Sequence, residues 1–169
     1  MNHTKTENIT KESIYKLLEE VYDPEVPVLT VLDLGIVRDV NIIGDKIEII
    51  ITPTYSGCPA MDVITINIRL KLLENGLKNF EVRQVLSPAW TTDWMSEEGK
   101  KKLKAFGIAP PNPKQVVCEP ELFAEEEAVQ CPHCDSYHTQ RISEFGSTAC
   151  KALYKCNNCQ EPFDYFKCH

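Results

Sequence analysis

The chain has 169 residues, of which 43% are hydrophobic and 25% are charged, and its formal net charge is −7. This composition fits one globular domain with a small appendage, and no apolar run reaches the roughly 20 residues that span a bilayer. The first residues lack the basic and then apolar pattern of a signal peptide, so we expect a cytoplasmic protein with reduced cysteines and no membrane partner.

The first predicted elements are a helix and a hairpin. Thr10 is a good helix cap, and prolines at positions 24 and 27 end the helix. Its apolar stripe consists of Ile14, Leu17, Leu18 and Val21. Residues 36–43 and 46–52 then read as two strands, and Gly44-Asp45 forms the turn between them.

Residues 60–74 fit two structures, because their apolar side chains both alternate as in a strand and form two rows at helical spacing. Pro59 near the start and Gly76 after the end favour a helix, with a wide buried face. A strand over 80–86 and a helix capped by Ser96 complete the pattern. We read the lysines of the last helix as a solvated face.

The pattern predicts an α+β fold in two parts. The first is a domain over residues 10–106, in the order helix, β-hairpin, helix, strand, helix. A linker rich in proline and glutamate follows over 107–130, and a cysteine-rich module occupies 131–169. We expect metal removal to unfold the module and leave the first domain intact.

The module contains two Cys-x-x-Cys pairs, which can close a tetrahedron around one metal ion. The four sulfurs belong to Cys131, Cys134, Cys156 and Cys159. A filled shell of four sulfurs leaves no open position for substrate, so we predict a structural zinc site, with iron as the main rival. Cys150 lies between the pairs and is an alternative ligand.

The charge of the module argues against nucleic acid as a partner. Four basic residues balance four acidic ones between Cys131 and His169: Arg141, Lys151, Lys155 and Lys167 against Asp135, Glu144, Glu161 and Asp164. Neutralising phosphates needs a basic face, which this balance does not supply.

Cys58 is the cysteine of most chemical interest in the first domain. It lies between a predicted strand and a predicted helix, where free amides at the helix start would stabilise a thiolate. The alternative is a small buried residue that fills a turn. No histidine lies in residues 10–106 to act as its base, so transient metal handling fits better than hydrolysis, and we expect no intrinsic catalysis.

Several segments resemble known families. Residues 23–27 (DPEVP), 33–37 (DLGIV) and 56–61 (SGCPAM) resemble the small iron–sulfur assembly domain of cluster-maturation factors. Residues 87–95, 145–155 and 161–167 resemble the PaaD family, also called PaaJ, of accessory subunits in the phenylacetyl-CoA monooxygenase (1,2-epoxidase) system. The resemblance extends over nearly the whole chain, from about residue 14 to 169.

The resemblance implies a role in phenylacetate degradation. The expected role is to assist assembly of an iron or iron–sulfur centre in a partner protein, either the di-iron oxygenase or the iron–sulfur reductase. Cys58 matches the assembly-domain cysteine, and Asp23 and Glu25 match the acidic-proline motif, as metal ligands or as turn residues. The four module cysteines match zinc-ribbon ligands, and Cys168 departs from the family pattern.

Two other functions stay open at this point. The chain could be an electron-transfer protein with iron in the four-cysteine site, or a structural adaptor in which Cys58 does no chemistry. Trp90 and Trp94 either form a recognition surface or pack on the core. We interpret Cys118, in the linker, as incidental.

Overall fold

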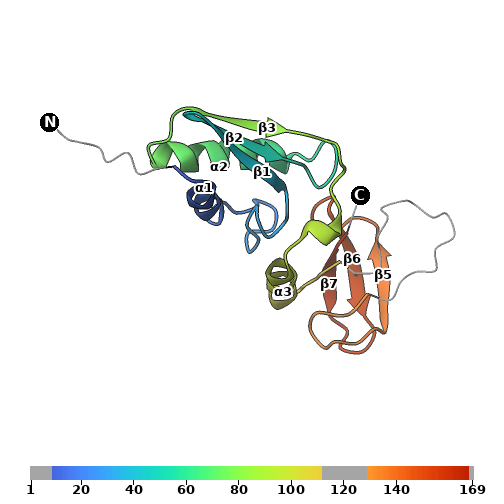
Figure 1. Cartoon of the computed structure of the whole chain (residues 1–169). Helices are drawn as coiled ribbons and strands as arrows, with labels where there is room; N and C mark the ends of the chain where they lie inside the picture. The colour runs from blue at the N-terminus through green and yellow to red at the C-terminus, as the bar shows by residue number, and fades with distance from the viewer. Residues whose placement is uncertain (1–8, 112–128, 168–169) are drawn as a thin grey trace.

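The computed structural model describes residues 9–111 and 129–167, which form a layer of helices and a three-stranded sheet next to a second, ribbon-like sheet (Figure 1). Helices and a three-stranded sheet precede a sheet that carries the four-cysteine cluster, so the predicted α+β fold class is confirmed. Of the helices in these two ranges, none has the length and apolar character needed to cross a bilayer.

The first helix and the hairpin form as predicted. Helix α1 covers Lys11–Leu18, and Thr10 and Ser13 bond to each other's backbone amides in a capping box. Strands β1 (Val37–Ile43) and β2 (Lys46–Ile51) pair antiparallel through a turn in which Gly44 has φ of 65°. A residue with a side chain would be strained there.

Helix α2 covers Ala60–Glu74 and leads back to strand β3 (Phe80–Gln84), which pairs parallel to β2. The first sheet therefore has the order β1-β2-β3. The predicted wide buried face is wrong, because only one apolar row of α2 meets the core. The second row is 43–54% exposed and consists of Val63, Ile66, Leu70 and Leu73.

A single-turn helix η1 (Thr92–Trp94) precedes helix α3 (Glu97–Ala105), and the Ser96 hydroxyl caps α3 by accepting from the amide of Gly99. The lysines of α3 are not simply a solvated face. Lys102 pairs with Asp33 in the first domain at 2.7 Å, and Lys104 pairs with Asp135 in the metal module. These two lysines tie α3 to both parts of the chain.

The second sheet has the strand order β4-β7-β6-β5. Its strands are β4 (Ile108–Ala109), β5 (Thr139–Ser143), β6 (Lys151–Cys156) and β7 (Pro162–Phe166). Strand β4 falls within the segment predicted as linker, yet it pairs parallel to β7. Most of that segment, including Cys118, lies outside the described residues, as does Cys168.

The two parts share a core. Ile108, Cys150 and Phe166 are buried in the same cluster as the side chains of the first domain. Trp90 joins them, because its ring meets Phe166 edge-on at 6.3 Å and its indole N–H donates to the carbonyl of Leu34 at 2.8 Å. Trp90 is only 3% exposed, so it forms no recognition surface.

This shared core bears on how the chain responds to metal removal. Loss of the ribbon would expose apolar surface of the first domain, because Phe166 and Ile108 cover it. We therefore revise the expectation from sequence: the first domain is destabilised, although not unfolded, when the ribbon unfolds.

Candidate functional site

The four-cysteine cluster forms as predicted. The sulfurs of Cys131, Cys134, Cys156 and Cys159 all lie within 4.8 Å of one another. Two of the separations are 3.8 Å (Cys131 to Cys159) and 3.5 Å (Cys134 to Cys156). Zinc–sulfur bonds of about 2.3 Å put tetrahedral sulfurs about 3.8 Å apart, so the residues fit a zinc ion.

The surroundings of the cluster shift its thiols in opposite directions: burial raises the pKa of Cys131 and, together with the neighbouring sulfurs, that of Cys159 to about 12. The amides of Cys159 and Asn158 donate to the sulfur of Cys156, and these bonds lower the pKa of that thiol to about 6. The residue after each pair, Asp135 or Gln160, has a positive φ, of 60° and 67°. This left-handed conformation turns each Cys-x-x-Cys back on itself so that both of its sulfurs face the centre.

Cys150 is not part of this cluster. It is 5% exposed and lies in the shared core, just before β6. Its sulfur lies 3.0 Å from the hydroxyl oxygen of Thr148 and donates to the Glu25 carboxylate at 3.4 Å. The structure therefore does not support Cys150 as a replacement for one of the four ligands.

Cys58 lies half-buried in the loop between β2 and α2, with Pro59 at the helix cap position. Burial raises the pKa of its thiol, and the charge of Glu25 adds to the rise. The amide of Ala60 and the phenol of Tyr55 bond to the sulfur and oppose this shift without cancelling it. The helix start does favour a thiolate as predicted, but desolvation outweighs it.

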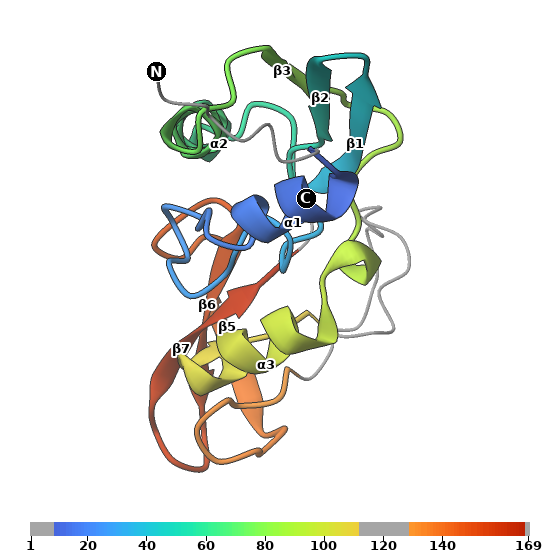
Figure 2. The ribbon, with the colours of Figure 1, turned by 60° about the vertical axis from the view of Figure 1, so that its left-hand side comes forward.

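Asp23 and Glu25 have different positions in their turn. One carboxylate oxygen of Asp23 accepts from the amides of Glu25 and Val26 at 2.8 and 2.7 Å, while burial raises the pKa of the acid. This is the geometry of a turn residue. The Glu25 side chain instead reaches the ribbon at Cys150. In Figure 2 the orange turn before β6 lies beside the blue loop after α1, where these two residues meet.

The phenol of Tyr55 is affected by Cys58, Glu25 and Cys150. Burial and then its contact with Cys58 raise the pKa of its phenol to about 12, and the charges of Glu25 and Cys150 contribute. Sequence reasoning identified Cys58 and Glu25 but missed Tyr55 and Cys150 as their neighbours. For Cys150 no sequence signal could have been used, since it lies 125 residues from Glu25.

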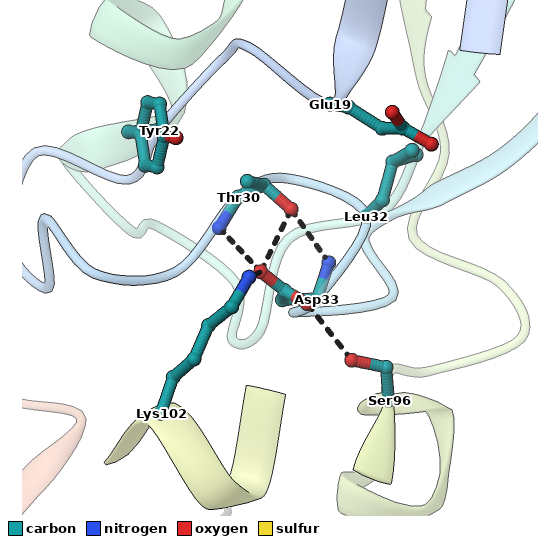
Figure 3. Close-up of a pocket in the computed structure, with 7 residues that line it drawn as sticks. All are labelled: Glu19, Tyr22, Thr30, Leu32, Asp33, Ser96 and Lys102. Atoms are coloured by element: carbon teal, nitrogen blue, oxygen red, sulfur yellow. Dashed lines mark hydrogen bonds and ion pairs between the residues drawn. The ribbon is translucent and has the colours of Figure 1, made fainter. Parts of the chain in front are cut away.

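A second polar site surrounds Asp33. It lies in a pocket of about 400 Å³ between the loop after α1 and helix α3 (Figure 3). Its carboxylate accepts from the amide and hydroxyl of Thr30, from Ser96 and from Lys102, at 2.7–3.1 Å. These partners outweigh the effect of burial and lower the pKa of Asp33. The polar groups satisfy one another, so we assign this site to structure and not to ligand binding.

Close packing explains why residue 35, two positions after Asp33, is a glycine. Its φ is 67°, and a Cβ atom there would lie 2.0 Å from the carbonyl oxygen of Trp94. The Asp-Leu-Gly sequence at 33–35 therefore lets η1 and α3 pack against the first domain.

Two protein-family models match this chain, one for an iron–sulfur assembly domain and one for a zinc ribbon. Residues 11–86 match the family model "Iron-sulfur cluster assembly protein", and residues 116–167 match "PaaD zinc beta ribbon domain". The second match begins inside the segment predicted as linker.

Three relatives agree with these matches. A protein from Escherichia coli (strain K12), named as one subunit of a "Putative 1,2-phenylacetyl-CoA epoxidase", is 51% identical over 92% of this chain and 91% of its own. "Fe-S protein maturation auxiliary factor" from Porphyromonas gingivalis is 38% identical over 56% of this chain and 90% of its own. A crystal structure of a DUF59 domain from Bacillus anthracis superposes with a TM-score of 0.52 at 31% identity, covering 55% of this chain and 90% of that one.

The alignment with the Escherichia coli protein covers both the first domain and the ribbon. The chain belongs to the PaaD family.

Proposed function

We propose that this protein is a non-catalytic maturation factor that helps to assemble an iron or iron–sulfur centre in a phenylacetyl-CoA epoxidase system. The relatives support this role by their names, since one is called a subunit of that epoxidase and another a maturation factor for iron–sulfur proteins. The partner would be the di-iron oxygenase or the iron–sulfur reductase of the same system, in the cytoplasm.

The observation that carries the proposal is the setting of Cys58. Its thiol is half-buried beside a carboxylate and a phenol, and no histidine is among the groups that shift its pKa. Such a thiol lacks the base that a hydrolase needs, but it can bind a soft metal ion and release it.

The ribbon has a different task in this proposal. Zinc would fill the four-cysteine cluster, since thiolates and tetrahedral geometry suit it, and no coordination position would remain for a reaction. The ion would hold β5, β6 and β7 together and so fix the turn that carries Cys150 against the first domain.

The test is a cellular one. In a strain that grows on phenylacetate, the Cys58→Ser variant should abolish epoxidase activity while the protein level stays normal. Cys118→Ser, outside the described residues, is the matched control and should retain activity. Full activity of Cys58→Ser would refute the role of this cysteine and leave a structural adaptor.

Electron transfer is the second candidate, because the same four sulfurs suit a single iron. Metal analysis and an absorption spectrum of the purified protein distinguish the two. We expect one zinc per chain and no visible band. A redox-active visible band that disappears in Cys131→Ser would establish the electron-transfer function instead.

A further inference from the structure

Cys150 is the one described cysteine that neither the zinc cluster nor the matched assembly-domain motif uses. Its position is nonetheless tightly specified. The amide of Lys167 donates to its carbonyl at 3.0 Å, and the turn that contains it is closed by a bond of 2.7 Å from the amide of Gly146 to the carbonyl of Lys151. A buried, fixed thiol that points at a carboxylate needs a physical explanation.

The carboxylate belongs to the opposite domain. Glu25 is placed by the turn that Asp23 organises, and its oxygen lies 3.4 Å from the Cys150 sulfur. The negative charge of Glu25 also acts on Cys58. The Glu25 carboxylate thus contacts one thiol and acts on the other through its charge. The three groups belong to three segments: the loop after α1, the loop before α2 and the turn before β6.

The local charges suit a cation. Asp23 and Glu25 are both acidic, and the nearby Lys151, with a side chain only 6% exposed, lies 3.8 Å from Asp164. Two acids and two thiols face one lysine, so a divalent ion would be offset by the ligands around it. Two sulfur ligands with one oxygen suit a borderline divalent ion, and the proposed maturation role makes that ion ferrous iron.

We propose that Cys58, Glu25 and Cys150 together bind one ferrous ion as cargo, so that the ribbon supplies one ligand of the assembly domain's metal site. This rests on the proposed maturation role and names its site. Three protein ligands leave a coordination position open, so a client protein can take the ion.

Binding requires a small closure. Among the described residues, only the four-cysteine group has three or more ligand atoms within 4.8 Å of one another. The loop of residues 52–59 therefore moves Cys58 toward Glu25 and Cys150 when the ion enters. The half-buried sulfur and the exposed Ser56 and Gly57 beside it allow this motion.

The test uses the zinc-loaded full chain carrying Cys118→Ser and Cys168→Ser, titrated with Co²⁺ without oxygen. We expect one further cobalt with a thiolate-to-cobalt absorption band, while zinc content stays unchanged. Cys58→Ser and Cys150→Ser should each reduce the band per bound cobalt to about half, since one of two thiolates is lost, and weaken binding about tenfold or more. An unchanged band in Cys150→Ser would overturn the proposal.

Glu25→Gln is a second test of the site, to be used if Cys150→Ser does not fold. It retains both thiols, so the band at saturation should persist while affinity falls about tenfold. Unchanged affinity in Glu25→Gln would also overturn the three-ligand site. The matched control is Glu19→Gln, an exposed acid at the C-terminal cap of α1, which should bind cobalt as the parent does.

The cellular assay separates this proposal from the maturation role. If Cys58→Ser abolishes epoxidase activity and Cys150→Ser retains all of it, the composite site is wrong and the maturation role stands. If cobalt binds as expected but both variants support full activity, the site stands and the maturation role is wrong.

Discussion

In the four-cysteine cluster every sulfur lies within 4.8 Å of the others, whereas at the domain junction Glu25 contacts Cys150 at 3.4 Å and Cys58 stands outside such a group. Amides donate to the Cys156 sulfur and lower the pKa of that thiol to about 6, whereas burial and the neighbouring sulfurs raise the pKa of Cys159 to about 12. At the junction, burial raises the pKa of Cys58, and that of Cys150 to about 12. The difference is one of geometry: the cluster already holds four sulfurs at tetrahedral separations, whereas the junction becomes a metal site only in the closed arrangement proposed above.

The largest effect should come from the cluster. Cys156→Ser removes a ligand whose site contributes binding energy on the order of 10–16 kcal/mol, so we expect loss of metal and unfolding of the ribbon. The first domain should melt at a lower temperature, because Phe166 and Ile108 no longer cover it. Metal analysis and limited proteolysis measure both effects. Retained metal with a folded ribbon would contradict the assignment.

The second largest effect should come from the packing between the first domain and the ribbon, tested without changing any cysteine. Trp90→Ala removes a buried ring that contacts Phe166, and it should reduce the free energy of unfolding by about 3–5 kcal/mol. Zinc content should stay unchanged. Phe106→Ala, where the ring is 54% exposed, is the control and should change stability by about 0.5 kcal/mol or less. Urea unfolding distinguishes the two variants.

The Asp33 network should have a smaller effect that depends on pH. Asp33→Asn should cost about 1–2 kcal/mol at neutral pH, because it weakens the bonds with Lys102 and Ser96. The folded pKa lies below the unfolded value, so this stability is present above about pH 4 and is lost as the pH falls through the folded pKa. Urea unfolding at several pH values measures it.

The control for this prediction is the exposed pair of Asp39 and Lys11. Asp39→Asn should change stability by well under 1 kcal/mol, since both side chains are about half exposed. An equal loss in the two variants would show that the Asp33 network is no more than a surface ion pair.

Cys58→Ser should have the smallest effect on stability. The side chain is half-buried and belongs to a loop, so the free energy of unfolding should change by about 1 kcal/mol or less. Thermal unfolding beside Cys156→Ser tests the comparison directly. If the two serine variants lost similar stability, Cys58 would be a structural residue.

Local patterns were sufficient to predict most of the fold. The caps at Thr10 and Ser96, the turn at Gly44 and the helix over 60–74 depend on nearby residues and formed as predicted. The error in α2 had a different cause. Its two apolar rows look alike in sequence, but the sheet covers only one of them.

The four-cysteine cluster was also predictable, because each pair is local and two pairs suffice for a tetrahedron. The junction was not. The contact between Glu25 and Cys150 depends on how α3 and β4 place the ribbon, through pairings such as Lys104 with Asp135. Such long-range placement leaves no periodic pattern in the sequence.

The strand order of the ribbon sheet has a consequence for synthesis of the protein. Strand β7 lies between β4 and β6, although it follows both in the chain. While the ribosome is still translating, Ile108 and Ala109 have no strand to pair with, and Trp90 has no Phe166 to contact. All four cluster cysteines precede β7, so the nascent chain can complete the metal cluster before the ribbon can pair with β4 and cover Trp90.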